Sequence, residues 1–132
     1  MILGTCLLEC YTAAYPLVEL HVSPPRFAVE IGERPVASPL ARLQAAAGRQ
    51  VTNLRHESVE LSELSRQVLR HLDGHHDRAA VLDGLAGLVA QGSLLAQQNG
   101  HPIKDPDRVQ GILGGALDEN LRELARGALL VA

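Results

Sequence analysis

Residues 61–100 read LSELSRQVLRHLDGHHDRAAVLDGLAGLVAQGSLLAQQNG, and the rest of the chain is arranged around them. Apolar residues recur there at helical spacing, which predicts two amphipathic helices separated by a turn at Asp73-Gly74. Gly74 is expected in the left-handed conformation of a helix C-cap, and Ser62 and Asp77 are the expected N-caps. The first helix has an apolar stripe of Leu61, Leu64, Val68 and Leu72, and its expected water-facing side is Glu63, Arg66, Gln67 and Arg70.

A β-hairpin is predicted directly after the second helix, which Gly92 should end. Asn99-Gly100 is a strong two-residue hairpin signal, with short apolar segments on both sides. Pro102 suits only an edge position of the return strand. Two helices followed by a hairpin predict an α+β, mostly helical, winged-helix-like domain with short strands. The stripe of the second helix is Val81, Leu82, Leu85, Leu88 and Val89.

The segments before this stretch predict a mixture of helices and strands. A helix is expected over residues 2–14 and ends before Pro16. Strands are expected over residues 17–22 and 27–31, and a short one over 51–54. Between them, Ser38 and Pro39 start a helix that contains Leu40, Leu43, Ala46 and Ala47 and closes at Gly48.

The longest helix is predicted after the hairpin, where Asp105-Pro106 provides a strong start signal. Its apolar stripe continues to Leu129 and is interrupted only by Asn120. Asp118 and Arg122 are expected to form an i,i+4 ion pair. Glycines 111, 114 and 115 are expected to let another helix approach closely.

Length and composition restrict the class of protein. The chain has 132 residues, 46% of them hydrophobic, so it can bury one core without disulfides. Only 2% are aromatic and the formal net charge is −3, which argues against nucleic-acid and anionic-membrane surfaces. We interpret residues 1–16 as a helix left from a preceding domain and 17–132 as the winged-helix-like domain. On this reading the chain is a fragment of a longer protein.

The two cysteines, Cys6 and Cys10, lie four residues apart in the first predicted helix. We interpret them as small apolar groups on one buried face; no second Cys or His pair lies at zinc-finger spacing. Reduced cysteines fit a cytoplasmic protein. No run of residues approaches the ~20 apolar residues of a membrane span.

Few residues suggest chemistry, and each has a simpler structural interpretation. A metal site at His71, His75, His76, Asp73 and Asp77 competes with a solvated turn between helices. An acid/base role for His56-Glu57 competes with a turn or capping element. The second helix lacks the cations and polar side chains that read a DNA groove. Arginines 26, 34, 42, 49 and 55 fit either a solvated face or a surface for an acidic partner. The candidate interaction surface is Arg42, Arg55, His56 and Glu57.

Three motifs together suggest a family: Pro24-Pro25-Arg26-Phe27, RPVASPLARLQA at 34–45 and VTNLRHE at 51–57. With the Leu72-Asp73-Gly74 turn and the helix end over 85–92, the chain resembles the C-terminal region of bacterial S-adenosylmethionine-dependent methyltransferases that carry a methyltransferase regulatory domain. Bacterial protein-lysine methyltransferases that modify outer-membrane proteins belong to this group. The resemblance extends from Val18 to Ala132.

The resemblance implies a winged-helix module and, upstream of it, a Rossmann-type catalytic domain that binds S-adenosylmethionine. It assigns no catalytic, cofactor-binding or metal-binding residue to this chain. We therefore expect a non-catalytic accessory domain that contacts protein: the rest of the methyltransferase, a protein substrate or a second copy. The alternatives are a homodimerisation module, using the first and last helices, and a DNA-binding winged-helix regulator.

Overall fold

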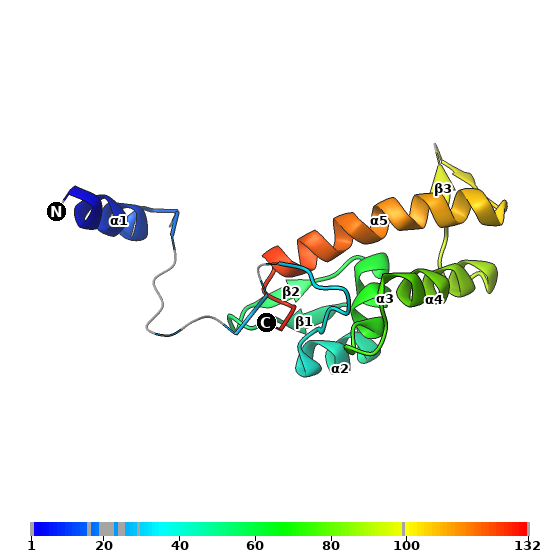
Figure 1. Ribbon diagram of the computed structural model, residues 1–132, viewed down its shortest axis with the longest axis horizontal. Helices are drawn as coiled ribbons and strands as arrows, with labels where there is room; N and C mark the ends of the chain where they lie inside the picture. Colours follow the sequence, from blue (N-terminus) through cyan, green and yellow to red (C-terminus); the bar gives the residue numbers. More distant parts are fainter. Residues whose placement is uncertain are drawn as a thin grey trace.

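The computed structural model describes residues 2–15, 17–18, 23, 26–28, 30–98 and 100–131, apart from the side chain of Gln98. Figure 1 shows α5 along one side of the body, α2 and α3 on the other, and α1 standing apart. The β3–β4 hairpin projects beside the first turns of α5. The elements are α1 (Ile2–Thr12), α2 (Pro39–Ala47), β1 (Gln50–Thr52), β2 (Ser58–Glu60), α3 (Glu63–His71), α4 (Arg78–Ala90), β3 (Gln97–Gln98), β4 (His101–Pro102) and α5 (Pro106–Arg126).

The two central helices begin where their capping residues predict. The Ser65 N–H donates to Ser62 Oγ at 3.0 Å, and the Ala80 N–H donates to Asp77 Oδ1 at 2.8 Å. Gly74 has a φ of +83° and reverses the chain between the helices, as expected. The prediction for Gln67 was wrong, because this side chain is buried and donates to Glu63 Oε1 at 2.7 Å. It is covered because α3 packs against α2, α4 and α5 on different sides.

The predicted hairpin is confirmed. Strands β3 and β4 are antiparallel, with Gln97 opposite Pro102 and Gln98 opposite His101. Gly100 has a φ of +78°, which glycine adopts without steric cost. The other predicted turn residue, Asn99, lies outside the described residues.

A second antiparallel pair joins β1 to β2, with Val51 opposite Val59. The sequence predicted a strand near β1, which ends at Thr52, but did not predict β2. Such a short strand has too little alternation to be recognised, and its pairing with β1 defines it. Leu61, which follows β2, is buried as expected.

One hydrophobic core lies among α2, α3, α4 and α5, and its largest side chains are leucines and valines. At the α3–α4 crossing, a Cβ on Gly84 would lie 2.9 Å from His71 Nε2. Gly84 therefore lets α4 approach α3 closely. The prediction that Gly111, Gly114 and Gly115 perform this role was wrong, because a Cβ at each would meet nothing within 4 Å.

Helix α5 begins as predicted, with the Asp107 N–H donating to Asp105 Oδ1 at 3.2 Å. It ends at Arg126 instead of Leu129, because Gly127 follows and Ala128 takes a φ of +54°. The expected Asp118–Arg122 ion pair was wrong. Asp118 pairs with Arg78 of α4 at 3.0 Å, and Arg122 lies 3.7 Å from Glu119.

The segment after α5 runs between two earlier parts of the chain. The Ala28 N–H donates to the Leu130 carbonyl at 2.8 Å, and the Val131 N–H donates to the Val36 carbonyl at 2.8 Å. Of the strand predicted over 27–31, Phe27 forms a bridge with Val131, residues 28, 30 and 31 are not in a strand, and Val29 lies outside the described residues. Of the strand predicted over 17–22, Leu17 and Val18 are not in a strand and residues 19–22 lie outside the described residues.

Helix α1 buries none of its residues and contacts no other helix or strand of the described chain. The predicted buried cysteine face was therefore wrong, because Cys6 is exposed and Cys10 is half-buried. The helix is largely apolar, but no described segment covers it. Among the described residues, no helix is long and apolar enough to cross a membrane.

Candidate functional site

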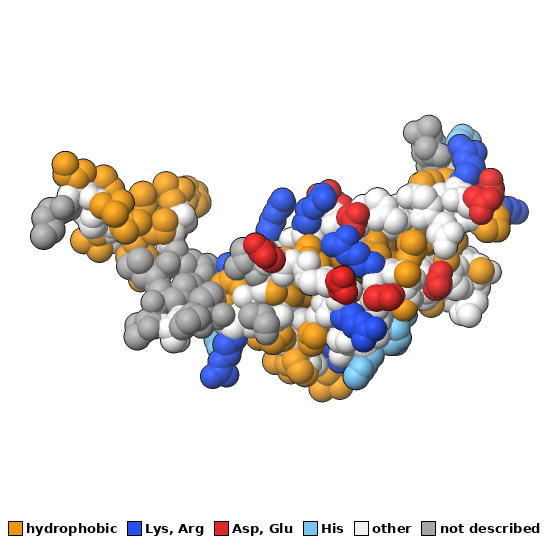
Figure 2. Space-filling view, viewed as in Figure 1, with side chains coloured by type: hydrophobic (Ala, Val, Ile, Leu, Met, Phe, Trp, Pro, Cys, Tyr) orange, Lys and Arg blue, Asp and Glu red, His pale blue; other side chains and the backbone are white. Residues whose placement is uncertain are grey.

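Helix α2 presents an apolar side to solvent. Its buried positions are Ala41 and Ala45, whose small side chains face α3 and β1. On the opposite side, Leu40 is 51% exposed and Leu43 is 72% exposed. Figure 2 shows hydrophobic side chains gathered at the lower edge of the body, where Figure 1 places α2. We call this side the α2 face, and it consists of Pro39, Leu40, Leu43, Ala46 and Ala47.

Arginines border the α2 face. A hollow of about 350 Å³ is lined by Pro39, Leu43 and Ala46 together with Arg42 and Arg70. The Nε atom of Arg42 is buried and has no hydrogen-bond partner. Arg70 Nη1 donates to Gln67 Oε1 at 3.1 Å.

The end of α2 is fixed by a further arginine. Arg66 Nη2 donates to the Ala46 carbonyl at 3.3 Å, and its Nε donates to the Ala45 carbonyl at 2.6 Å. A guanidinium there satisfies carbonyls that the helix leaves unpaired and complements the negative end of the helix dipole. The apolar face thus has positive charge at its border.

The turn from β1 to β2 is organised by a buried asparagine. Asn53 Oδ1 accepts from the N–H groups of Arg55 and Glu57, each at 2.9 Å, and Asn53 Nδ2 donates to Glu57 Oε2 at 3.0 Å. His56 completes the turn with a φ of +63°, an uncommon conformation for a residue with a Cβ. His56 and Glu57 thus occupy a turn, the structural interpretation given above.

Arg55 ties this turn to the end of α5. Its guanidinium carbon lies 4.8 Å from the centre of the Phe27 ring, and its Nη1 lies 3.4 Å from the Arg126 carbonyl. Arg55 lines a hollow of about 270 Å³ that also contains Phe27 and Arg126. The structure therefore brings Arg55, His56 and Glu57 together in one turn, whereas Arg42 lines a different hollow on α2.

The histidine-rich turn between α3 and α4 is arranged around Asp73. Asp73 Oδ1 accepts from the backbone N–H groups of His75 and His76 at 2.8 Å and 3.2 Å, and it lies 2.8 Å from His76 Nδ1. His71 Nδ1 is directed away, to the Gln67 carbonyl at 2.8 Å. Within the described residues no group of three or more His, Cys, Asp or Glu side chains could hold a metal ion.

The hydrogen bond from His76, with the two backbone N–H groups, holds the pKa of Asp73 well below its usual range, although partial desolvation opposes this. A depressed carboxyl pKa stabilises the fold above the unfolded-state value of about 4, and this contribution is lost as pH falls below it.

We expect the urea midpoint of the wild type to fall between about pH 7 and about pH 3 by more than that of Asp73→Asn, since Asn cannot titrate. Asp83→Asn, at an exposed position of α4, should show the same fall in urea midpoint between the two pH values as the wild type. Equal pH dependence in Asp73→Asn and the wild type would contradict this assignment.

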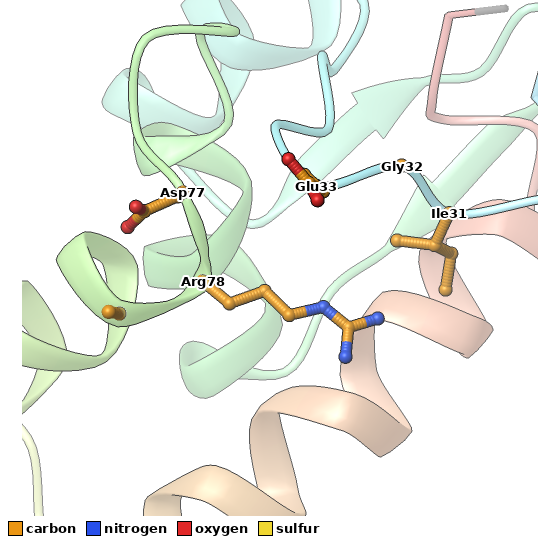
Figure 3. A pocket seen from close by; sticks show the side chains of 6 residues that line it. Ile31, Gly32, Glu33, Asp77 and Arg78 are labelled. Carbon is orange, nitrogen blue, oxygen red and sulfur yellow. The ribbon is translucent and has the colours of Figure 1, made fainter.

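A broader hollow of about 530 Å³ lies where the segment before α2 meets the start of α4. Figure 3 shows Arg78 extended across it toward α5, with Ile31, Gly32 and Glu33 on the loop opposite. Arg78 forms an ion pair with Asp118, and its Nη1 lies 3.0 Å from Asp118 Oδ1. These residues form no nucleophile–base pair.

Helix α4 occupies the position of a DNA-recognition helix in a winged-helix fold. Its only cation is Arg78, which is the residue paired with Asp118. The remainder, apart from Asp83, is Ala, Gly, Leu and Val. Apart from the paired Arg78, such a helix offers no side-chain donors for base edges.

Together, α3, α4, the β3–β4 wing and the β1–β2 pair define a winged-helix domain. The chain belongs to the family described as "PKMT, C-terminal winged helix domain", whose model matches residues 33–129. PKMT denotes protein-lysine methyltransferase.

Solved structures of PKMT2 from Rickettsia typhi, one of them in complex with AdoHcy, share this fold with a TM-score of 0.77 and 21% identity. The match covers 84% of this chain and 23% of theirs. A Rickettsia prowazekii protein described as uncharacterized is 28% identical over 81 residues, which is 61% of this chain and 15% of that protein. The chain thus spans less than a quarter of the length of these relatives.

Sequence reasoning missed two features of these surfaces. Asn53 has a local signal, because asparagine between two strands often bonds nearby backbone N–H groups. The α2 face also has a signal, since apolar residues occur on all sides of residues 39–47. The choice between its buried and exposed sides depends on α3 and β1, and the sequence does not specify this.

Proposed function

We propose that this chain is the non-catalytic C-terminal accessory domain of an S-adenosylmethionine-dependent protein-lysine methyltransferase and that it works by contacting protein. The observation that carries the contact role is the α2 face. Solvent-facing helix positions are ordinarily polar, and a helix with apolar residues all round is ordinarily buried. Here Leu43 and Leu40 are largely exposed.

The family assignment supports the methyltransferase context. One related Rickettsia typhi structure is described as a complex with AdoHcy, and this chain corresponds to 23% of that protein. We infer that S-adenosylmethionine binds a separate catalytic domain. Residues 1–16 would then belong to the preceding domain, and Arg55, His56 and Glu57 would add a polar contact surface to the α2 face and Arg42.

The non-catalytic assignment is tested by calorimetric titration of the chain with S-adenosylmethionine. We expect no saturable heat, since the cofactor site is assigned to another domain. Saturable binding at micromolar cofactor would contradict the assignment of roles.

The contact role is tested by placing a photo-crosslinking amino acid at position 43 and, as a matched control, at position 95. Leu43 and Leu95 are 72% and 74% exposed, but Leu95 precedes the wing. Position 43 should give protein adducts, identified by mass spectrometry as a methyltransferase chain, its protein substrate or a second copy. Equal adducts from the two positions would contradict a role for the α2 face.

DNA binding is the runner-up, favoured by the winged-helix fold alone. A fluorescence anisotropy titration with random duplex at low salt discriminates between the two. The neutralised Arg78 and apolar α4 lead us to expect no saturable binding. Saturation with a steep salt dependence would favour the DNA-binding regulator instead.

A further inference from the structure

We propose that the α2 face binds an acidic amphipathic helix, which the catalytic part of the same polypeptide supplies. The inference rests on the proposed function, since it takes this chain to be one domain of a larger methyltransferase, and it names the kind of segment that the domain contacts. Charge, shape and contact area each support it.

The segment that contains α2 is basic, although the chain as a whole carries a formal net charge of −3. Residues 34–56 contain four arginines and no Asp or Glu. Among the described side chains, Figure 2 shows hydrophobic ones and no red Asp or Glu along the lower edge of the view, where α2 lies. A partner that approaches α2 therefore meets a positive potential, which attracts acidic segments and repels basic ones.

Two arginines beside the α2 face have no counter-charge in the described part of the chain. Arg66 is already paired, because its Nη1 lies 3.1 Å from Glu63 Oε1. Neither Arg42 nor Arg70 forms an ion pair with a described residue. Arg42 Nε is buried without a hydrogen-bond partner, and the exposed Arg70 donates to the uncharged Gln67 side chain at 3.1 Å. Carboxylates of a partner would supply the missing counter-charge.

The hollow beside α2 has the shape that a helix requires. Pro39, Arg42, Leu43 and Ala46 recur at i, i+3, i+4 and i+7, so they line one side of α2, and Arg70 borders them from α3. A second amphipathic helix can place its apolar residues over Leu43 and Ala46 and its flanking carboxylates beside the two arginines. A membrane surface fits less well, because it is flat and α2 exposes only two leucines to insert into it.

The size of the α2 face favours a partner within the same polypeptide. Helix α2 has nine residues, so it is about 14 Å long. Its exposed side falls well short of the roughly 800 Å² that each partner buries in a stable complex of separate proteins. A linker holds two domains at an effective concentration in roughly the millimolar range, so a small contact suffices. The match covers 23% of the related PKMT2, which leaves most of such a methyltransferase to supply the helix.

Titration of the isotope-labelled chain with two synthetic peptides, followed by NMR, tests the chemistry of the contact. Both peptides carry leucines at helical spacing, which are flanked by glutamates in one peptide and by lysines in the other. The glutamate peptide should shift the amide signals of residues 40–47 and Arg70 saturably, because it matches the two arginines. The lysine peptide should not. Arg42→Glu/Arg70→Glu should reverse this preference.

Single charge changes provide the matched control. Arg70→Glu should weaken binding of the glutamate peptide about fivefold, whereas Arg26→Glu, the same change at an exposed position outside the hollow, should leave it unaltered. Equal shifts with both peptides, or no shift at residues 40–47, would overturn the inference. Anionic phosphatidylglycerol vesicles that shift these signals when the glutamate peptide does not would overturn it in favour of a membrane.

The source of the helix is tested in the full-length methyltransferase, with the photo-crosslinking amino acid again at position 43. The adduct should join position 43 to an acidic segment of the catalytic part of the same polypeptide, with a yield that does not depend on protein concentration. An adduct with the protein substrate in place of the catalytic part would overturn the inference and leave the proposed function standing. Equal adducts from positions 43 and 95 would contradict both.

Discussion

Replacing Leu69 with alanine is expected to lower the free energy of unfolding by about 3 kcal/mol. Leu69 is fully buried in α3, and α3 packs against α2, α4 and α5. Because α4 and α5 also pack against each other, the site has little freedom to collapse around the missing atoms. The cost therefore includes a cavity as well as the lost transfer of the side chain from water.

Urea unfolding followed by circular dichroism measures this loss, with Leu95→Ala as the control. Leu95 is 74% exposed, so its truncation should change the free energy of unfolding by less than about 0.5 kcal/mol. A loss below about 1 kcal/mol for Leu69→Ala would mean that α3 is not the centre of the core.

Replacing Asn53 with alanine is expected to cost about 2 kcal/mol, through polar contacts instead of packing. The substitution removes the acceptor of the Arg55 and Glu57 N–H groups and the donor to the Glu57 carboxylate. It also removes the contacts that hold His56 at a positive φ. We expect the β1–β2 turn to become mobile while the helices persist.

Asn53→Asp is the matched variant, because its carboxylate still accepts from both N–H groups but faces Glu57 without a donor. The two carboxylates repel, so this variant should lose stability at neutral pH and regain part of it at acidic pH, where one of them is protonated. Amide hydrogen exchange localises the effect: Arg55 and Glu57 should lose protection in the alanine variant, and residues 63–71 should not. Unchanged protection at Arg55 and Glu57 would show that Asn53 does not organise the turn.

Local signals in the sequence were sufficient for the winged-helix core. Ser62, Asp77 and Asp105 cap helices through hydrogen bonds to residues two or three positions away, and Gly74 and Gly100 adopt a positive φ. Contacts of this range are encoded in short windows of sequence. The order of helix, helix and hairpin followed from them, whereas the resemblance to the methyltransferase family rested mainly on the motifs at 24–27, 34–45 and 51–57.

The features that the sequence did not predict depend on contacts between residues far apart in the chain. Arg78 reaches Asp118 across forty positions, which no helical spacing rule anticipates. Gln67 is buried because α3 is surrounded, and Cys6 is exposed because no described segment covers α1. In the candidate surface, Arg55, His56 and Glu57 share a turn that is formed by residues close in sequence. Arg42 lies beside Arg70 only because α2 packs on α3, which the sequence does not specify.

The way Leu130 is held has a consequence for biosynthesis. Its backbone lies between Ala28 and Ala37, so residues separated by about a hundred positions must meet before the core closes. A ribosome adds residues in order, and such distant pairings are slow to form. The nascent domain should therefore remain open to chaperones and proteases until Val131 has left the exit tunnel, however early its helices form.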